Sequence, residues 1–235
     1  MEEIRYLIGI DEAGRGPLAG PVVVGGIRIE SGIMNHELWN GIKDSKKLSA
    51  KQREKWFECL TNHPEIKWAV AHVWPTTIDR IHIKEATNLG ARRVYAKLCS
   101  QSPHPKQPHP KLSLGQESII KIRGKSRIGT NPKLSLGYGG RGVGGVFTLL
   151  DGGLSLSKST PHKAIIKGDE KIPIISAASI IAKVTRDRLM VRLHKRYPEY
   201  RFDLHKGYGT VLHREMIREF GRCEVHRQSF KIAVV

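Results

Sequence analysis

Acidic residues close several short apolar runs of this sequence, in positions where their carboxylates could bind metal ions together. They are Asp11 and Glu12 in IGIDEAGRGPLAGP (8–21), Asp151 in VFTLLD (146–151) and Asp169 in KAIIKGD (163–169). If each run is a β-strand, these side chains lie where strands end and can meet at one edge of a sheet. Crowded carboxylates raise one another's pKa unless a cation neutralises them. The pattern therefore predicts a divalent-metal site.

Hard cations such as Mg²⁺ and Mn²⁺ prefer oxygen ligands of this kind. Two of them, roughly 3.5–4 Å apart, can activate a water molecule and stabilise the leaving oxygen in phosphodiester cleavage. A single Asp is more often a turn former or helix cap, but an Asp-Glu pair followed by Gly14, Arg15 and Gly16 fits that alternative poorly. Neighbouring strand residues point to opposite faces, so Asp11 and Glu12 can share a metal only if the strand ends there.

The composition points to a polyanionic partner. The 235 residues contain 40 Lys and Arg against 22 Asp and Glu, which favours nucleic acid first and an acidic membrane surface second. Three widely spaced cysteines, Cys59, Cys99 and Cys223, fit neither a disulfide framework nor a zinc site and favour a reducing cytoplasm. No apolar stretch approaches membrane-spanning length, and the start lacks a signal-peptide pattern. We expect a cytoplasmic protein without membrane contact.

Hydrophobic periodicity predicts the elements that must position these acids. Strands are expected over 4–11 and 22–29, joined by a glycine- and proline-rich turn, and over 66–74, 146–151 and 163–169. Helices are expected after the Ser49–Gln52 capping box, over 76–98, over 173–197 with Pro173 in the first turn, and over 211–220 before Gly221. This mixture indicates an α/β domain with a mixed sheet.

Residues 101–145 do not fit that pattern. The segment is rich in Pro, Gly, Ser and Lys, repeats PKLSLG at 110–115 and 132–137, and has eight Lys and Arg against the single acid Glu117. Long structureless loops are rare inside compact domains, so we expect an exposed, disordered insertion. A tolerated insert without a role is one interpretation, and a basic arm that raises affinity for nucleic acid is the other.

Several blocks of the sequence, in order, resemble the ribonuclease HII family. They are IGIDEAGRGPLAGPVV, KDSKKLS (43–49), IDRIHIKEAT (78–87), LLDGG, IIKGDEKIPIISAASIIAKVTRDRLM (165–190), HKGYGT (205–210) and HRQSF (226–230). The resemblance implies a ribonuclease H-like core over 1–100 and 146–197 and a small helical C-terminal part over 198–235. It also implies metal-dependent endonucleolytic cleavage of RNA in RNA–DNA hybrids, and of DNA with embedded ribonucleotides, on the 5′ side of the ribonucleotide, leaving a 3′-hydroxyl.

The resemblance also assigns residues by matching motif. Asp11, Glu12, Asp151 and Asp169 are the implied ligands of Mg²⁺ or Mn²⁺, with two ions expected. The implied substrate contacts are the junction-sensing turn Gly14-Arg15-Gly16, the sugar-packing Tyr208, and the phosphate-contacting Ser45, Lys46, Ser176, Ser179 and Lys183. Glycine suits such a turn because backbone can approach a ribose 2′-hydroxyl, the group that distinguishes RNA from DNA, only where no side chain intervenes. Asp187 is the rival fourth carboxylate, but its place within a helix beside Arg186 and Arg188 favours a structural ion pair.

Two alternatives stay open from the sequence. A ribonuclease HIII-like enzyme would share the core, although no extra N-terminal domain precedes the first strand here. A basic nucleic-acid-binding protein with the same fold and no catalysis is the other, and it would bind hybrids without metal-dependent cutting. Nothing in the sequence demands more than a monomer, and it does not show which replication or repair partner, if any, docks on the protein.

Overall fold

The computed structural model of the protein describes residues 4–35, 37–101 and 145–232. The predicted insertion therefore lies outside the described residues, apart from Gln101 and Gly145. The strands are β1 (Tyr6–Ala13), β2 (Val22–Glu30), β3 (Lys67–Val73), β4 (Val146–Asp151) and β5 (His162–Ile165). The α-helices are α1 (Ala50–Asn62), α2 (Pro75–Ser100), α4 (Gly168–Lys171), α5 (Pro173–Arg196), α6 (Phe202–His205) and α7 (Val211–Phe220). Short 3-10 helices are η1 (Ser31–Asn35), η2 (Glu37–Trp39), η3 (Ser45–Lys47) and η6 (Pro198–Tyr200).

The strands form one mixed sheet in the order β3-β2-β1-β4-β5. Strands β1, β2 and β3 pair antiparallel, whereas β4 and β5 join the other edge of β1 in parallel. The parallel strands β1 and β4 are far apart in the chain, as a crossover connection requires, whereas residues 152–161 alone connect β4 to β5. The central position of β1 explains its continuous apolar run, because both of its faces are covered.

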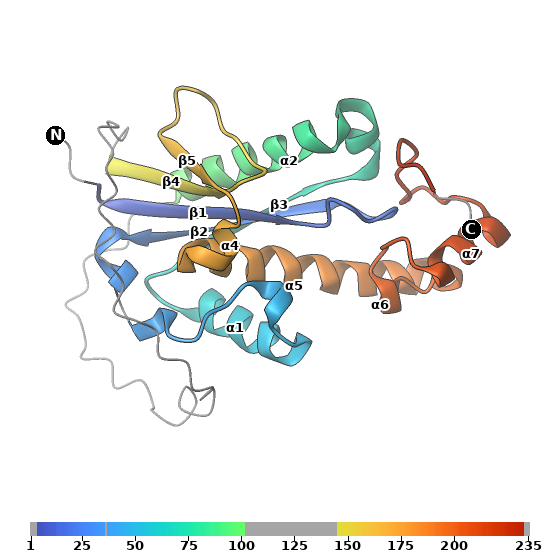
Figure 1. The fold of residues 1–235 in the computed structure, drawn as a ribbon, viewed down its shortest axis with the longest axis horizontal. Coiled ribbons are helices and arrows are strands. Elements are labelled where there is room, and N and C mark those ends of the chain that lie inside the picture. Colours follow the sequence, from blue (N-terminus) through green and yellow to red (C-terminus); the bar gives the residue numbers. More distant parts are fainter. Residues whose placement is uncertain (1–3, 36, 102–144, 233–235) are drawn as a thin grey trace.

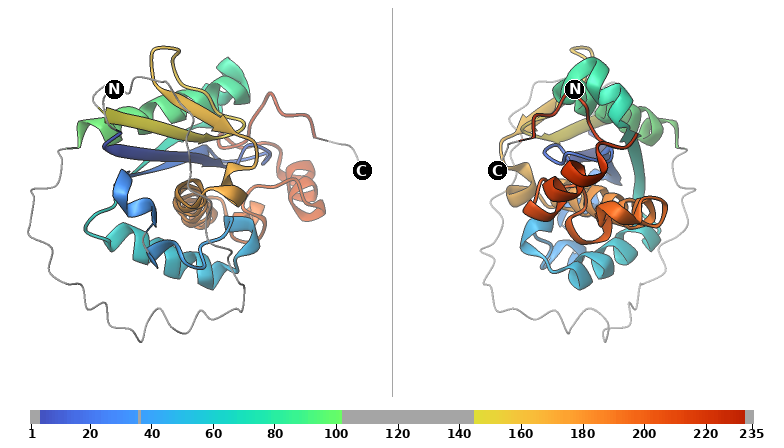
Figure 2. Two further views of the ribbon diagram at one scale, coloured as in Figure 1. Left: turned by 60° about the vertical axis from the view of Figure 1, so that its left-hand side comes forward. Right: turned by 90° about the vertical axis from the view of Figure 1, so that its right-hand side faces the viewer.

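Helices cover both faces of the sheet, which gives a layered α/β architecture (Figures 1 and 2). Helix α2 packs on one face, against side chains such as Ile8 and Ile10 of β1. Helix α5 packs on the other face, against Leu7 and Leu149, and α1 lies beyond α5 as an outer layer. The fold is thus the predicted mixed sheet flanked by helices, with β1 and α5 at its centre.

Glycines in the two central strands let the helices approach the backbone closely. A Cβ atom on Gly25 would lie 2.7 Å from the Ala182 backbone nitrogen and 2.8 Å from the Ala178 carbonyl oxygen, both in α5. A Cβ atom on the next residue, Gly26, would lie 2.4 Å from a methyl group of Val94 in α2. Successive strand residues face opposite layers, so this glycine pair serves one helix on each side.

The C-terminal part forms a separate small cluster at the end of α5 (Figure 1). Its buried side chains come from the end of α5, from η6, α6 and α7, and from the turn after β1, and include Met190, Tyr200, Phe202 and Ile217. Thr210 caps the start of α7 by accepting from the His213 amide, and Gly221, at φ +74°, ends it as expected.

Several predicted elements match the structure closely, and two differ. The capping box of α1 forms, and Pro173 stands at the start of α5. The predicted strand over 163–169 is wrong at its end, because β5 stops at Ile165 and Asp169 lies in the one-turn helix α4. The left-handed conformation of Lys167, at φ +55°, turns the chain between them. Helix α2 is also interrupted at His82, where φ is +63°.

Candidate metal centre

Three of the four predicted acids converge at one edge of the sheet. Asp11 and Glu12 near the end of β1 and Asp151 at the end of β4 each place a carboxylate oxygen within 4.8 Å of the others. Within the described part of the chain, this is the one group of three or more acidic, His or Cys side chains that could hold a metal ion. The fold thus brings together acids that the sequence places on separate strands.

The strand pairing explains how neighbours on β1 can share one site. Strand β1 continues to Ala13 along β2, so the strand does not end at Asp11. Its pairing with β4, however, ends at Ile10. Beyond that residue no strand lies against this edge of β1 in the described part of the chain, so side chains from both faces can reach around it toward Asp151.

The electrostatics of Asp11 and Glu12 show uncompensated negative charge. Burial, followed by the neighbouring carboxylates of Glu12 and Asp151, raises the pKa of Asp11 well above its ordinary value. Burial also raises the pKa of Glu12, although Arg15, whose Nη1 lies 3.1 Å from Glu12 Oε1, opposes the shift. The second oxygen of that carboxylate, Glu12 Oε2, is buried without a hydrogen-bond partner among the described residues.

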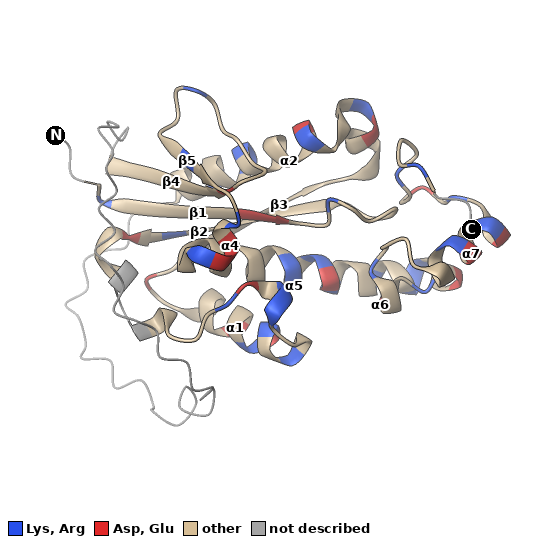
Figure 3. Ribbon diagram, viewed as in Figure 1, with Lys and Arg blue, Asp and Glu red and all other residues tan. Residues whose placement is uncertain are grey.

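Asp169 stands beside this group. Its side chain is buried, and its Oδ2 atom lies 3.2 Å from the ammonium nitrogen of Lys46 in η3. Its charge still acts on Asp11, whose pKa it helps to raise. The turn that carries it is tied to the cluster directly, because the Gly168 amide donates to Asp151 Oδ1 at 2.8 Å. Figure 3 shows acidic residues on β1 and α4, with Lys and Arg along α5 and the start of α1.

The residues present fit a divalent cation. The donors are hard carboxylate oxygens, one of them is buried and unpartnered within the described chain, and their mutual repulsion is relieved only in part by Arg15. A cation bound between Asp11, Glu12 and Asp151 would offset both causes of the raised pKa of the first two, which are burial and then repulsion between the carboxylates.

The predicted junction-sensing turn follows β1 directly. Gly14 adopts φ +91°, a left-handed conformation that favours glycine, and Gly16 is exposed with open space around it. Tyr208, in the loop before α7, is 42% exposed. The Arg186 guanidinium carbon lies 5.6 Å from the centre of its ring, and the Lys183 ammonium lies 5.8 Å from it. The turn follows β1, Lys183 lies on α5, and Tyr208 lies in the loop between α6 and α7.

The predicted phosphate-contacting serines make internal hydrogen bonds in this structure. Ser45 Oγ and Ser179 Oγ are both buried and lie 2.7 Å apart, which links η3 to α5. Ser176 Oγ donates to the Asp169 carbonyl oxygen at 2.5 Å. Their contact with phosphates stays a prediction. Lys46, by contrast, has a largely exposed side chain, and its contact with a phosphate also stays a prediction.

Asp187 forms the ion pair that the sequence suggested, with a different partner. Its Oδ1 lies 2.8 Å from the Lys183 ammonium, four residues earlier on α5. The neighbouring Arg188 pairs with Glu54 of α1 instead. Asp187 is not part of the group formed by Asp11, Glu12 and Asp151, and the choice of Asp169 as the fourth acid stays a prediction.

Two buried arginines behind the turn could not be recognised from the sequence. Arg186 is fully buried and donates to the carbonyl oxygens of Ala19, Pro21 and Lys206. Arg227, in the motif HRQSF, is 1% exposed. Sequence patterns place arginine on surfaces, so the signal for these two was only their membership in long motifs.

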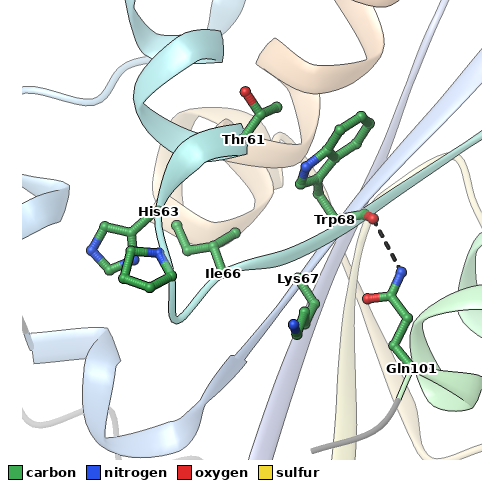
Figure 4. Close-up of a pocket in the computed structure, with 7 residues that line it drawn as sticks. Thr61, His63, Ile66, Lys67, Trp68 and Gln101 are labelled. Carbon is green, nitrogen blue, oxygen red and sulfur yellow. Dashed lines mark hydrogen bonds between the residues drawn. The ribbon is translucent and has the colours of Figure 1, made fainter. Parts of the chain in front are cut away.

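The pocket shown in Figure 4 lies elsewhere. It has a volume of about 470 Å³, sits between the end of α1 and the start of β3, and contains none of the predicted site residues. Gln101 Nε2 donates to the Trp68 carbonyl oxygen across it at 3.3 Å. Its lining residues are Thr61, His63, Pro64, Ile66, Lys67, Trp68 and Gln101. With no acid among them, this pocket offers no alternative metal site.

A mixed sheet in this order, with carboxylates converging where β1 and β4 part, defines a metal-dependent nuclease of the ribonuclease H type. Comparison with known proteins is more specific. The sequence profile of the family described as ribonuclease HII matches residues 8–122 and 155–233. The chain therefore belongs to the ribonuclease HII family. The matched stretches contain Asp11, Glu12 and Asp169, whereas Asp151 lies between them.

Individual relatives agree with this family assignment. Ribonuclease HII of Chlamydia caviae is 39% identical over 229 residues, which are 97% of this chain and 85% of that protein. Ribonuclease HII of Polynucleobacter necessarius is 37% identical over 227 residues, with 97% and 93% covered. The protein is an endoribonuclease H, a hydrolase that acts on RNA–DNA hybrids, and its family depends on divalent metal ions.

Solved structures support the fold. The ribonuclease H2 of Pyrococcus horikoshii superposes with a TM-score of 0.61 at 27% identity, covering 97% of this chain and 94% of that one. A ribonuclease HIII structure with Mn²⁺ superposes with a TM-score of 0.62, but at 17% identity and with 68% of that chain covered, so this likeness shows the fold alone. The HIII-like alternative is thus not better supported than ribonuclease HII. In the described part of the chain, no helix combines the length and apolar character needed to cross a bilayer.

Proposed function

We propose that this enzyme cuts DNA at embedded ribonucleotides as well as RNA in hybrids, on the 5′ side of the ribonucleotide, leaving a 3′-hydroxyl. The observation that carries the proposal is the convergence of Asp11, Glu12 and Asp151, with Glu12 Oε2 buried and unpartnered in the described chain. We assign Asp169 as the fourth ligand, because its charge already acts on Asp11 and because a metal ion can replace Lys46 at its carboxylate.

Two divalent cations held there would supply an activated water and charge stabilisation at the leaving oxygen. The protein's own part is to hold four carboxylates in place and to bind the substrate beside them. The backbone of the Gly14-Arg15-Gly16 turn, which is exposed at Gly16, is the surface for a ribose 2′-hydroxyl, and Tyr208 packs on the neighbouring sugar. Lys46 and Lys183 contact phosphates, together with Ser45, Ser176 and Ser179.

Asp151→Asn tests the metal site. The variant is expected to lower cleavage of a duplex with one ribonucleotide by more than about 100-fold, above the effect of a residue that only supports a metal ligand. Asp187→Asn is the matched control, since it removes a carboxylate paired with Lys183, and most activity should remain. Turnover by Asp151→Asn at the parent rate, with the protein folded, would overturn the assignment.

The same assay with and without EDTA separates the enzyme from a non-catalytic nucleic-acid-binding protein of this fold. The enzyme cuts only when Mg²⁺ or Mn²⁺ is present, and titrating each ion shows which supports faster turnover. A binding protein would retain the hybrid and leave it intact. We also propose that the enzyme acts as a monomer in the cytoplasm, without membrane contact; cysteines that form no disulfide in the described residues support a reducing compartment.

A further inference from the structure

The segment after α7 lies across the back of the Gly14-Arg15-Gly16 turn and holds it through one side chain. Arg227 donates from Nη2 to the Gly14 carbonyl oxygen at 2.6 Å and from Nη1 to the Arg15 carbonyl oxygen at 2.7 Å. Its Nε atom donates to the Gly20 carbonyl oxygen at 3.0 Å. One guanidinium therefore binds both ends of the loop between β1 and β2. The backbone amide of Arg227 adds a bond to the Leu18 carbonyl at 2.8 Å.

These bonds fix the direction of the peptide groups that face the substrate. A peptide unit is planar and trans, so its carbonyl oxygen and the following N–H point in opposite directions. With the Gly14 and Arg15 carbonyls bound to Arg227, the N–H groups of Arg15 and Gly16 point away from it. Within the described part of the chain, neither N–H donates a hydrogen bond to the protein. Two oriented, unused donors are what a hydroxyl or phosphate oxygen needs from glycine-rich backbone.

A second anchor holds the segment that carries Arg227. Asp79, in the second turn of α2, accepts from the Gln228 amide at 3.0 Å, the Ser229 amide at 2.9 Å and the Ser229 hydroxyl at 2.6 Å. From the other side, Arg222 donates to the carbonyl oxygens of Gln228 and Phe230 at 2.8 Å each. These contacts join two motifs with no role so far, IDRIHIKEAT and HRQSF.

The arrangement is costly, which argues that it serves more than packing. Burial and the neighbouring Arg186 guanidinium lower the pKa of Arg227 to about 9, which still leaves it protonated at neutral pH. Both guanidiniums are bound mainly by backbone carbonyls, and the side chains of Tyr208 and Asp79 oppose the lowering of the Arg227 pKa only in part. A buried cation of this kind is unfavourable for folding compared with an apolar side chain of similar size.

We infer that Arg227 is a positioning residue that sets the peptide planes of the Gly14-Arg15-Gly16 turn for recognition of the ribose, and that Asp79 supports it from α2. The inference rests on the proposed function of that turn. The guanidinium suits this task because its planar fork binds several carbonyl oxygens in fixed directions, which a lysine ammonium cannot do.

The test compares two duplexes, one with a single embedded ribonucleotide and one fully RNA–DNA hybrid. A single ribonucleotide offers one 2′-hydroxyl, so its cleavage depends on exact placement of the turn, whereas a hybrid offers one at every step. We expect Arg227→Lys to lower kcat on the single-ribonucleotide duplex by about 100-fold and to lower kcat on the hybrid much less. Asp79→Ala should lower the ratio of kcat on the single-ribonucleotide duplex to kcat on the hybrid by about 10-fold.

Asp79→Ala keeps the test decisive if Arg227→Lys fails to fold, because Asp79 is only half-buried. Glu224→Ala is the control, since it removes a carboxylate of the C-terminal part that pairs with Arg196 and does not touch the turn; its ratio should equal that of the parent. Thermal unfolding of each variant shows whether it is folded.

The failures of the two proposals are distinguishable. If the unaltered enzyme cuts hybrids but not single ribonucleotides, the proposed function fails. If it cuts both, and folded Asp79→Ala or Arg227→Lys keeps the parent's ratio, the positioning role is wrong. Equal losses on both substrates would also contradict it, because they would show a merely structural contribution.

Discussion

At the scale of single residues, Asp11 lies where its carboxylate can bind a metal ion but where its negative charge is unfavourable for folding. Its pKa is raised by burial and by neighbouring carboxylates, so its ionised form is less stable in the folded protein than in the unfolded chain. We therefore expect Asp11→Asn to abolish cleavage while raising the free energy of unfolding in EDTA by on the order of 1 kcal/mol, or about 2–4 °C in melting temperature. The substituted amide keeps an oxygen that can accept from the Glu12 amide.

Thermal unfolding with and without metal checks this expectation. Saturating Mg²⁺ should stabilise the parent and leave the variant almost unchanged, since only a folded protein with its ligands intact gains from binding. Asp187→Asn serves as the comparison, because that carboxylate has an ion-pair partner and its loss should not stabilise the protein. A melting temperature for Asp11→Asn below that of the parent in EDTA would show that the carboxylates do not repel as described.

Residue types and motif order were enough to predict the acids of the site, but not their partners. Asp11, Glu12 and Asp151 converge as expected. The pairing of Asp169 with Lys46 and the bonds from Arg227 to the turn join residues more than 100 positions apart. Such contacts depend on how η3, α4 and the C-terminal segment are docked, which local patterns do not encode.

At the scale of elements, the contact between β2 and α5 depends on Gly25. A Cβ atom there would lie within 3 Å of backbone atoms of Ala178 and Ala182, which cannot move without shifting the helix. We expect Gly25→Ala to lower the free energy of unfolding by about 1–3 kcal/mol, the usual cost of overpacking a core. Activity should fall as well, since Gly25 pairs with Asp11 in the sheet.

Chemical denaturation measures the free energy of unfolding of Gly25→Ala, with Gly32→Ala as the matched control. No heavy atom lies within 4 Å of the position that a Cβ atom on Gly32 would occupy, so that change should stay within about 0.5 kcal/mol of the parent. Equal stability of the two variants would mean that α5 does not approach the sheet as closely as described.

Elements with strong local signals were predictable, and the turn before Asp169 was not. Hydrophobic periodicity and caps located α1, α5 and α7, because apolar faces and capping side chains act within a few residues. The run KAIIKGD reads as one strand, yet Lys167 is left-handed and α4 follows. That conformation is held by the bond from Gly168 to Asp151, a contact with another strand.

At the scale of the whole molecule, the charge of the chain is unevenly distributed in sequence. Residues 101–145 carry eight Lys and Arg against one acid. If this segment acts as a basic arm, its deletion should weaken binding to a hybrid and make the slope of log affinity against log salt less negative. Binding in EDTA over a range of salt concentrations measures the slope. An unchanged slope would exclude the arm and leave a tolerated insert.

The C-terminal part has a buried histidine network that should make the whole molecule sensitive to acid. The Cys223 amide donates to His226 Nδ1 at 3.0 Å, so the proton of this ring is on Nε2, which lies 3.1 Å from His213 Nε2. His213 in turn donates from Nδ1 to the Tyr208 carbonyl oxygen at 2.9 Å. Each ring is thus neutral, and both of its nitrogens are hydrogen-bonded. A second proton on His213 would place its Nε2–H against the Nε2–H of His226. A second proton on His226 would place its Nδ1–H against the Cys223 amide.

Burial accordingly lowers the pKa of His213 to about 3 and that of His226 to about 4. Both rings are neutral in the folded protein, whereas in the unfolded chain they take up protons near pH 6.5. The stability that they contribute is therefore complete above about pH 6.5 and is lost as the pH falls toward 4, by on the order of a few kcal/mol. Because both rings stay neutral in the folded protein down to about pH 4, His213 keeps its bond to the Tyr208 carbonyl, and the effect of acid through these rings is on stability.

Urea unfolding between pH 7.5 and 4.5 tests this expectation, with His213→Asn as the variant. Its amide can donate and accept without titrating, so the variant should be less stable than the parent at pH 7.5 but should lose less stability on acidification. His162→Gln, in β5 outside the network, should follow the parent over the whole range. If His213→Asn and the parent lose stability in parallel, protonation of other groups must account for the acid sensitivity, and the histidine network does not make stability depend on pH.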